Sequence, residues 1–446
     1  MAHRLFGTDG VRGKAGHVPL DSATIRRLGA ALVRVLPTRA GPARLIVGRD
    51  TRESGPWIER EFACGVASSG GAVTSAGVIP TPAIAYLARE LPFDAGVVIS
   101  ASHNPYEDNG IKVFSGAGEK FSEPLEREVE AVVVDPSWET PAGEAPELPS
   151  TDLSARYLEH ARQALPEPDR LGRLKIAIDC ANGATSHVAS ALFAGLGFDV
   201  TLIGAEPDGQ NINRDCGSTH PQRLSRVVVE RGCTLGVAFD GDGDRAIFVD
   251  VAGRVVDGDA VMYMCARHMA AAGRLAGNAV VATVMSNIGL EIALREAGIT
   301  VVRCPVGDKY VMEEMQKQGL SLGGEQSGHV IFSDLLYTGD GLVTALSVLD
   351  VMATSRRTLA DLAGELVTYP QVLLNVRVGR RADVASVPPL AAVIADVEAR
   401  LAGNGRLLVR YSGTEPLLRI MLEGKNQTEI HAMAEEIAAQ ARTHLA

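Results

Sequence analysis

Three segments of the sequence repeat one local pattern, and this repetition constrains the fold more than any other feature. The segments begin at Arg44, Leu174 and Ala279. In each, a β-rich apolar run leads through a polar or glycine-containing turn into a helical stretch, a glycine and a second β-rich run. Each has the length that a right-handed strand–helix–strand crossover requires. We therefore expect three similar α/β domains with mixed, largely parallel sheets.

The sequence between and after these segments predicts the domain boundaries. Residues 135–151 hold four prolines and several acidic residues, a composition typical of a linker. From about Tyr369 the pattern changes to a strand, a helix, two strands joined by a turn and a final helix, which predicts a smaller C-terminal α+β domain. With a further boundary near Gly258, the predicted domains are residues 1–151, 152–257, 258–368 and 369–446.

Charge and hydropathy exclude several classes of function. The formal net charge of −11 repels polyphosphates and anionic membranes, so we expect no nucleic-acid partner. No stretch reaches the ~18 consecutive apolar residues needed to cross a bilayer, and the first residues lack the apolar core of a signal peptide. We therefore expect no membrane insertion and a cytoplasmic location. Six scattered cysteines predict neither a disulfide framework nor a cysteine zinc site, but small buried residues.

Ser102 follows a run, DAGVVIS, that we expect to be a buried strand. Open α/β sheets bind ligands at the C-terminal ends of their strands. The alternative is a turn or helix-cap serine. A pairing of Ser102 with His103 is not expected, because neighbouring side chains of an extended segment point to opposite sides. Lys112, in NGIKVF, is a candidate for holding a phosphate or moving a proton, and its alternative is a solvated lysine.

Three aspartates alternate with glycine in FDGDGDR, after the apolar run TLGVAF. The carboxylates of Asp240, Asp242 and Asp244 are expected to converge and to repel one another unless a divalent cation lies among them. A calcium EF-hand is excluded because its sixth position is Arg245 and its twelfth is Val251. Magnesium with a phosphate oxygen fits better, and Arg245 would bind another phosphate oxygen. The alternative is a solvated acidic turn.

A third loop, RYSGTEPLLR, has the composition of a cradle for a phosphate dianion, with guanidinium groups, hydroxyls and free backbone N–H groups. A hairpin turn with incidental arginines is the alternative. The candidate residues are Arg410, Ser412, Gly413, Thr414 and Arg419.

A fourth loop, GGEQSGHVIF, places Glu325 and Ser327 on the same side of an extended segment, with His329 two residues further on. A carboxylate beside a hydroxyl can bind the vicinal hydroxyls of a sugar, although a loop held by its own polar contacts explains the pattern equally well.

Taken together, these loops resemble those of the bacterial phosphoglucosamine mutases, a family of the α-D-phosphohexomutase superfamily. The resemblance covers the whole chain in the family's order and implies four domains around a central cleft. It also implies interconversion of glucosamine 6-phosphate and glucosamine 1-phosphate, an isomerase reaction that feeds UDP-N-acetylglucosamine and cell-wall precursor synthesis. The motifs are FGTDGVRG (6–13), VGRDTRESG (47–55), SASHNP (100–105), DGDGDR (240–245), VGDKYV (306–311), GEQSGH (324–329), TGDG (338–341) and RYSGTEP (410–416).

The resemblance also implies roles for individual residues. Ser102 becomes the serine that is phosphorylated in the active enzyme and a metal ligand beside the three aspartates. Glu325 and Ser327 become the sugar loop, and the loop around residue 412 the phosphate loop. Arg12, Lys112, Lys309 and His329 become cleft residues. The resemblance implies that Lys309 contacts substrate phosphate, where related enzymes often have arginine, and lysine lacks the bidentate geometry of arginine.

From these parts we expect phospho-Ser102 to pass its phosphoryl group to the sugar and to recover the other one from a 1,6-bisphosphate intermediate, with hinged opening of the C-terminal domain. Glucosamine or glucose 1,6-bisphosphate would prime the serine. The resemblance suggests a homodimer. Three alternatives stay open: a phosphomannomutase or phosphoglucomutase, a magnesium-dependent aspartyl phosphatase, whose DxDx[TV] pattern fails at Asp244, and a non-catalytic regulator that binds sugar phosphates.

Overall fold

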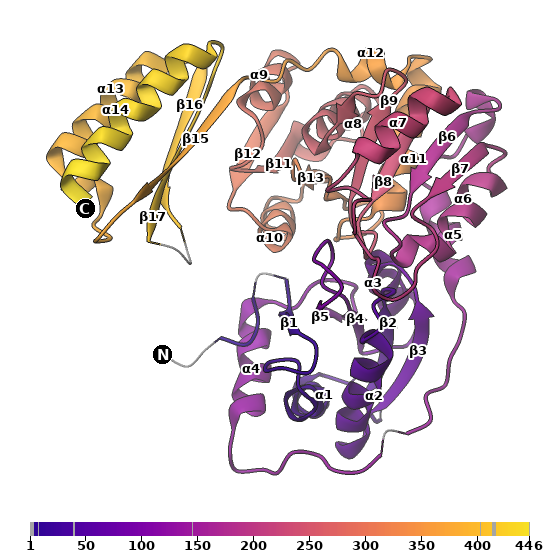
Figure 1. Ribbon diagram of the computed structural model, residues 1–446. Helices are drawn as coiled ribbons and strands as arrows, with labels where there is room; N and C mark the ends of the chain where they lie inside the picture. The colour runs from indigo at the N-terminus through magenta and orange to yellow at the C-terminus, as the bar shows by residue number, and fades with distance from the viewer. Residues whose placement is uncertain are drawn as a thin grey trace. The chain divides into compact units, whose positions relative to one another are not determined.

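The computed structural model describes residues 4–7, 9–38, 41–144, 146–401, 403–412 and 416–445. The chain divides into two compact units (Figure 1). The large unit comprises Met1–Met285 and Gly298–Glu365, and the small unit comprises Ser286–Ala297 and Leu366–Ala446.

The large unit contains three sheets with the same strand order, β5–β4–β2–β3, β9–β8–β6–β7 and β14–β13–β11–β12. In each of these sheets the three strands written last are parallel to one another. The strand written first, β5, β9 or β14, pairs antiparallel with its neighbour. Antiparallel edge strands, β1 and β10, extend the first two sheets. Three similar α/β domains with mixed sheets are therefore confirmed.

The strands of the large unit are β1 (Val11–Lys14), β2 (Arg44–Arg49), β3 (Ala72–Val78), β4 (Ala95–Ile99), β5 (Asp108–Ser115), β6 (Lys175–Asp179), β7 (Asp199–Ile203), β8 (Leu235–Phe239), β9 (Ala246–Asp250), β10 (Val255–Val256), β11 (Ala279–Thr283), β12 (Thr300–Cys304), β13 (Leu322–Gly324) and β14 (Val330–Phe332). Its helices are α1 (Ser22–Val35), α2 (Gly55–Ser68), α3 (Thr81–Glu90), α4 (Glu123–Val134), α5 (Ser154–Arg162), α6 (Ala189–Gly195), α7 (Gln222–Arg231), α8 (Gly258–Ala271), α10 (Asp308–Gln318), α11 (Gly341–Ser355) and α12 (Leu359–Ala363).

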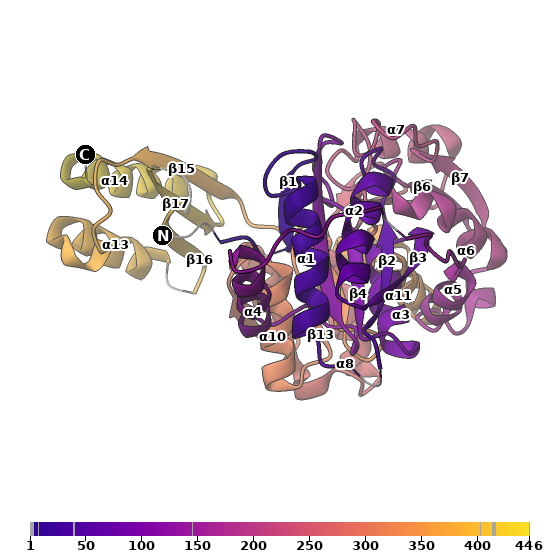
Figure 2. The ribbon, with the colours of Figure 1, turned by 90° about the horizontal axis from the view of Figure 1, so that it is seen from below.

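Local sequence explains how these elements begin. The Asp21 carboxylate caps α1 by accepting from the backbone N–H groups of Ala23 and Thr24. Proline stands in the first turn of α2 and α3, where its fixed φ suits the helix and no N–H is needed. α1 and α2 lie side by side against the first sheet (Figure 2). Every residue of β4, β8 and β13 is buried, as expected for central strands covered on both faces.

The three central strands β4, β8 and β13 hold equivalent places in their sheets, and each leads into one of the candidate loops. Ser102 follows β4, Asp240 follows β8, and Glu325 follows β13. The chain then returns in each sheet as an antiparallel strand. The repeated topology therefore supplies one functional loop from the same position of each domain.

The predicted linker is irregular but follows the first domain. The backbone of Ser75 in β3 bonds to Pro149 and Thr151. The Arg26 guanidinium donates to the carbonyls of Pro141 and Gly143 at 3.2 and 3.0 Å. The segment is thus attached to the sheet and helices that precede it.

The small unit is an antiparallel sheet in the order β15–β17–β16 with two long helices, which confirms the predicted α+β domain. The α9 segment belongs to this unit. The Asn287 side chain bonds to both backbone groups of Tyr369 at 2.9 Å. Its elements are β15 (Gln371–Arg377), β16 (Gly405–Tyr411), β17 (Leu417–Gly424), α9 (Ile288–Glu296), α13 (Pro388–Leu401) and α14 (Gln427–Leu445).

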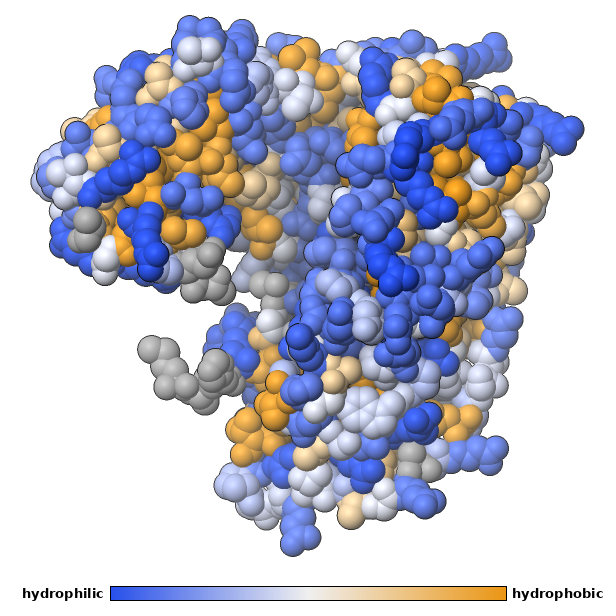
Figure 3. All heavy atoms as spheres, viewed as in Figure 1, coloured by the Kyte–Doolittle hydropathy of each residue, from blue (hydrophilic) through white to orange (hydrophobic). Residues whose placement is uncertain are grey.

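Burial follows the predicted pattern. The cysteines Cys64, Cys180, Cys216, Cys233, Cys265 and Cys304 are free and buried. Among the described residues no helix is long and apolar enough to span a membrane. The visible surface of the large unit is mostly hydrophilic, with separate hydrophobic patches such as the one near α7 (Figure 3). Val229 of α7 is 55% exposed.

Candidate active site

Ser102 lies in a turn that brings its hydroxyl to two partners. Its φ is +53°, in the left-handed region that residues other than glycine rarely adopt. The hydroxyl donates to Asp240 Oδ2 at 2.6 Å, and His103 Nδ1 lies 3.3 Å from Ser102 Oγ. The expectation that Ser102 and His103 point to opposite sides is wrong, because it assumed an extended backbone at this position.

The three aspartates of the loop after β8 converge as predicted. Asp240, Asp242 and Asp244 are at most 3% exposed, and each offers an oxygen within 4.8 Å of the others. Oδ1 of Asp242 and Oδ1 of Asp244 are buried without a hydrogen-bond partner among the described residues. Buried carboxylate oxygens that accept no hydrogen bond suit a hard divalent cation, so the donor set fits such an ion.

The glycines of this loop allow it to touch the serine loop. A Cβ on Gly241 would lie 2.6 Å from the Ser102 carbonyl oxygen, which is too close for any side chain. Gly243 has φ +73°, and a Cβ there would lie 2.7 Å from the Thr185 methyl group. The alternation of Asp and Gly thus reflects a close approach of two loops as well as ligand spacing.

Basic groups reduce the repulsion that the sequence predicts among these carboxylates. Lys112 Nζ lies 2.9 Å from Asp242 and 3.4 Å from Asp244. Burial opposes its charge, but the carboxylates outweigh burial and hold the pKa of Lys112 well above its ordinary value. Arg245 Nε lies 3.8 Å from Asp244. The site can therefore accommodate a divalent cation, but repulsion among the carboxylates does not by itself require one. The alternative of a solvated Lys112 is wrong, because the residue is 2% exposed.

The carboxylates respond to these neighbours in opposite ways. Burial, Asp244 and Asp242 raise the pKa of Asp240 well above its ordinary value. Burial also acts on Asp244, but Lys112 and His329 outweigh it and lower the pKa of Asp244. Asp240 and Asp244 thus differ in how firmly they hold a negative charge, and Asp244 holds it more firmly because Lys112 and His329 face it.

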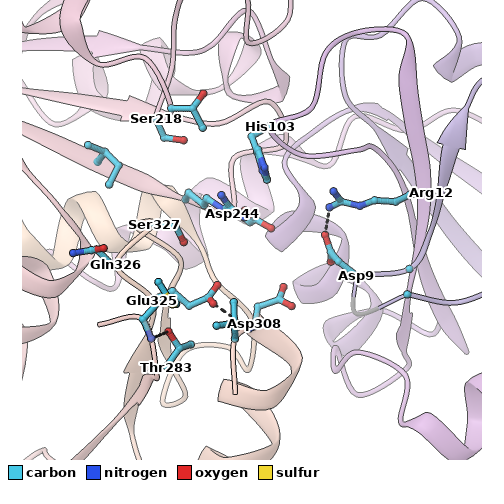
Figure 4. A pocket seen from close by; sticks show the side chains of 18 of the residues that line it. Asp9, Arg12, His103, Ser218, Asp244, Thr283, Asp308, Glu325, Gln326 and Ser327 are labelled. Carbon is cyan, nitrogen blue, oxygen red and sulfur yellow. Dashed lines mark hydrogen bonds and ion pairs between the residues drawn. The ribbon is translucent and has the colours of Figure 1, made fainter. Parts of the chain in front are cut away.

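A cavity of about 840 Å³ opens beside the cluster (Figure 4). Its size is that of a small-molecule site. In Figure 4 the side chains of Arg12, His103, Asp244 and Asp308 point toward the same space. Burial, then Arg245 and Arg12, lower the pKa of His103 to about 4, so its ring is neutral at pH 7. The predicted residues that line the cavity are Arg12, Asp244, Arg245, Glu325 and Ser327.

His329 is buried, and a backbone N–H group fixes the orientation of its ring. The N–H of Gly339, in the TGDG motif, donates to His329 Nε2 at 3.1 Å, so in the neutral ring the proton lies on Nδ1. Nδ1 is 3.7 Å from Asp244 Oδ1. Asp244, Asp308 and His329 form a second cluster of the kind that can hold a metal, but this tautomer presents a proton, not a lone pair, to Asp244.

Lys309 is buried and is not among the residues that line the cavity. Its Nζ lies 2.8 Å from Glu126 of α4, so it joins the third domain to the first. A second ion pair of the same kind joins Lys120 to Asp308. The predicted phosphate contact of Lys309 stays a prediction.

The small unit brings two of the predicted phosphate-loop residues together. Arg410 and Arg419 are direct cross-strand partners on β16 and β17, so their side chains share one face of the sheet. Ser412 is 2% exposed, and its N–H donates to the Leu417 carbonyl at 2.8 Å. The other two predicted residues, Gly413 and Thr414, lie outside the described residues.

Sequence reasoning did not single out several groups of this site. Asp9 lines the cavity and pairs with Arg12, Lys112 and Lys120. Asp308 lines it too. Both lie inside motifs of the family resemblance, FGTDGVRG and VGDKYV, and this position could have identified them as site residues.

Comparison with known proteins agrees with this architecture. Models of the phosphoglucomutase/phosphomannomutase α/β/α domains I, II and III match residues 3–138, 155–253 and 257–369, and the model of the C-terminal domain matches residues 373–440. The chain belongs to the phosphoglucomutase/phosphomannomutase family. The resemblance read from the sequence motifs is thereby confirmed.

Curated relatives in this family are similar over their whole length. The phosphoglucosamine mutase of Syntrophotalea carbinolica is 47% identical, with 100% of this chain and 98% of the relative covered. That of Desulforudis audaxviator is 49% identical, with 97% and 96% covered.

Solved structures of the phosphoglucomutase/phosphomannomutase family share the fold. A family member from Burkholderia thailandensis aligns with a TM-score of 0.81 at 24% identity, over 99% of this chain and 98% of that one. The N-acetylphosphoglucosamine mutase of Aspergillus fumigatus, solved in complex with GlcNAc-6P and magnesium, aligns with a TM-score of 0.68 at 18% identity, over 98% and 95%.

Proposed function

We propose that this member of the phosphoglucomutase/phosphomannomutase family is a phosphoglucosamine mutase, an isomerase that interconverts glucosamine 6-phosphate and glucosamine 1-phosphate. The observation that carries the proposal is the 2.6 Å hydrogen bond from the Ser102 hydroxyl to Asp240, in a carboxylate cluster beside a cavity large enough for a sugar phosphate. The full-length relatives support the choice of glucosamine phosphate.

The reaction moves one phosphoryl group at a time. The Oγ–P bond of phospho-Ser102 breaks while a P–O bond forms to the free hydroxyl of the substrate. The substrate hydroxyl gives its proton to a basic group of the cavity, and Ser102 Oγ takes up a proton to become a hydroxyl. The resulting 1,6-bisphosphate turns over, and its other phosphoryl group returns to Ser102 by the reverse step. Glucosamine or glucose 1,6-bisphosphate would supply the first phosphoryl group.

The chain's own residues carry the binding tasks. Glu325 and Ser327 line the cavity where they can hold the sugar hydroxyls. Arg245 and Arg12 face the same space and suit the phosphate that reacts, whereas Arg410, Ser412 and Arg419 with Gly413 and Thr414 would hold the other phosphate. Lys112 keeps its proton and balances the charge of the aspartates.

Mg²⁺ held by Asp240, Asp242, Asp244 and Ser102 would supply positive charge to the transferring phosphoryl group. Hard oxygen ligands favour Mg²⁺ over softer metals. A homodimer and a cytoplasmic location remain predictions of the sequence.

The test is a coupled assay of purified protein with Mg²⁺, glucose 1,6-bisphosphate and either glucosamine 6-phosphate, glucose 6-phosphate or mannose 6-phosphate. We expect the highest kcat/KM with the glucosamine phosphate, and intact-mass spectrometry with peptide mapping should place a phosphate on Ser102. A preference for glucose or mannose phosphate would overturn the substrate assignment. Phosphate on Asp240 would instead favour the phosphatase, and binding without turnover would favour the regulator.

A further inference from the structure

Arg52, in the VGRDTRESG motif, is a fully buried cation that does not line the cavity. It is 1% exposed, yet its guanidinium reaches the loop that carries Ser102. Nη2 donates to the carbonyl oxygens of Ser102 and Asn104 at 3.2 and 2.6 Å. On its other side Nη1 pairs with the buried Asp50. One planar fork thus joins a buried carboxylate to two carbonyls of the serine loop.

Asn213, from the second domain, binds the same two carbonyls. Its Nδ2 donates to Ser102 O at 2.9 Å and to Asn104 O at 3.1 Å. The N–H of Ser102 donates to Ser100 Oγ at 2.9 Å, and Ser100 in turn bonds to Asp50. Both the N–H and the carbonyl group of Ser102 are therefore held by hydrogen bonds.

We propose that Arg52 is a positioning residue for Ser102, which holds the serine in its left-handed conformation so that Oγ faces the aspartate cluster. Without these donors the carbonyl oxygens of Ser102 and Asn104 would lose hydrogen bonds, and Ser102 would relax toward the conformations that serine prefers. A shift of the nucleophile by about 1 Å is enough to cost about 100-fold in rate. The consequence for catalysis rests on the proposed function, whereas the effect on the loop does not.

The test compares Arg52→Lys with wild type by two independent measurements. Lysine keeps the charge but carries its three N–H donors on one nitrogen, so it cannot span from Asp50, bound by Nη1, to the two carbonyls bound by Nη2. We expect amide hydrogen exchange of residues 102–104 to become at least about 10-fold faster. We also expect kcat per folded molecule, and the rate of Ser102 phosphorylation by glucose 1,6-bisphosphate, to fall at least about 10-fold with KM changed less than about 2-fold.

Arg27→Lys is the matched control. Arg27 also donates to two backbone carbonyls, that of Val133 in the last turn of α4 at 2.6 Å and that of Trp138 after the helix at 2.9 Å. It should change stability without changing exchange at Ser102 or kcat. If Arg52→Lys does not fold, Asn213→Asp serves instead, because it sets a carboxylate oxygen against the same two carbonyls and should give the same changes.

Unchanged exchange at residues 102–104 in the Arg52 or Asn213 variant would overturn the proposal, and so would a rate loss that Arg27→Lys reproduces. Failure of the wild-type protein to form phosphoserine would contradict the proposed function, and the exchange comparison would then still decide the role of Arg52.

Discussion

The hydroxyl of Ser102 donates a 2.6 Å hydrogen bond to Asp240, although the two residues are 138 positions apart in the chain. The contact joins equivalent loops of two repeated domains, since each follows the central strand of its sheet. It places the group that we expect to carry phosphate against the cluster that we expect to hold the metal. The packing of domains therefore assembles the site. Substitutions of residues that hold its loops in place can be predicted separately from substitutions of the residues that we expect to bind metal or phosphate.

Asp242→Asn should raise the Mg²⁺ concentration needed for half-maximal activity at least about 10-fold, because it removes one charged oxygen donor from the cluster. Titration of mutase activity with Mg²⁺ measures the shift. The matched control is Asp250→Asn, another buried aspartate of the same domain, which accepts from Arg254 and backbone N–H groups and lies outside the cluster. Equal Mg²⁺ dependence in wild type and Asp242→Asn would contradict a metal site here.

Gly241→Ala should lower kcat by about 100-fold, because its Cβ would lie 2.6 Å from the Ser102 carbonyl and force the two loops apart. Steady-state kinetics at saturating substrate measure the effect. Gly232→Asn is the control, because Gly232 is left-handed with nothing within 4 Å of the added Cβ, and asparagine tolerates that conformation. Normal turnover by Gly241→Ala would show that the close approach is dispensable.

Lys309→Met should lower the free energy of unfolding by up to about 3 kcal/mol, because it removes the nearer cation of the buried Glu126 carboxylate and leaves only the more exposed Arg4, 3.6 Å away. Denaturant unfolding measures this, and Lys309→Met with Glu126→Gln should recover part of the loss. Lys317→Met breaks an exposed pair on the same helix and should cost no more than about 0.5 kcal/mol.

The kinetics of the Lys309 variants test the phosphate contact that the family resemblance predicts. If Lys309 binds substrate phosphate, KM should rise in both the single and the double variant. A KM that recovers in the double variant would instead assign Lys309 to domain docking.

His160→Phe should remove a pH dependence of stability. His160 is 3% exposed, stacks on Tyr86 at 4.1 Å, and its Nε2 has no hydrogen-bond partner among the described residues. Burial, then Arg89, lower the pKa of His160 to about 4 from 6.5. The unfolded chain therefore binds more protons between these values, so stability falls as pH drops through that window.

Thermal unfolding between pH 7 and pH 4 measures the effect. The wild-type midpoint should fall more steeply over this range than that of His160→Phe, whose ring keeps the stacking and loses the unpaired nitrogen. The exposed His187→Gln is the control and should follow wild type. Identical slopes in wild type and His160→Phe would reject the assignment.

Local sequence predicted the repeated elements and the chemistry of the loops. Strand–helix–strand segments are recognised by the period of their apolar residues. Asp alternating with Gly after an apolar run that forms a buried strand indicates metal-ligating carboxylates on a tight loop. Neither signal depends on which distant segment lies next to it. The α/β class, the small α+β domain and the aspartate cluster were therefore accessible from the order of residues alone.

Tertiary structure alone decided which groups face one another. The left-handed turn at Ser102 depends on donors from Arg52 and Asn213, which lie 50 and 111 positions away, so no local rule places His103 beside it. From the sequence alone, Lys112 could be a solvated residue or a ligand for phosphate. In the structure it pairs with three carboxylates from distant segments, those of Asp9, Asp242 and Asp244. Hydrogen bonds and charge interactions act over a few ångströms of space, and the folding of the chain, not its order, determines those distances.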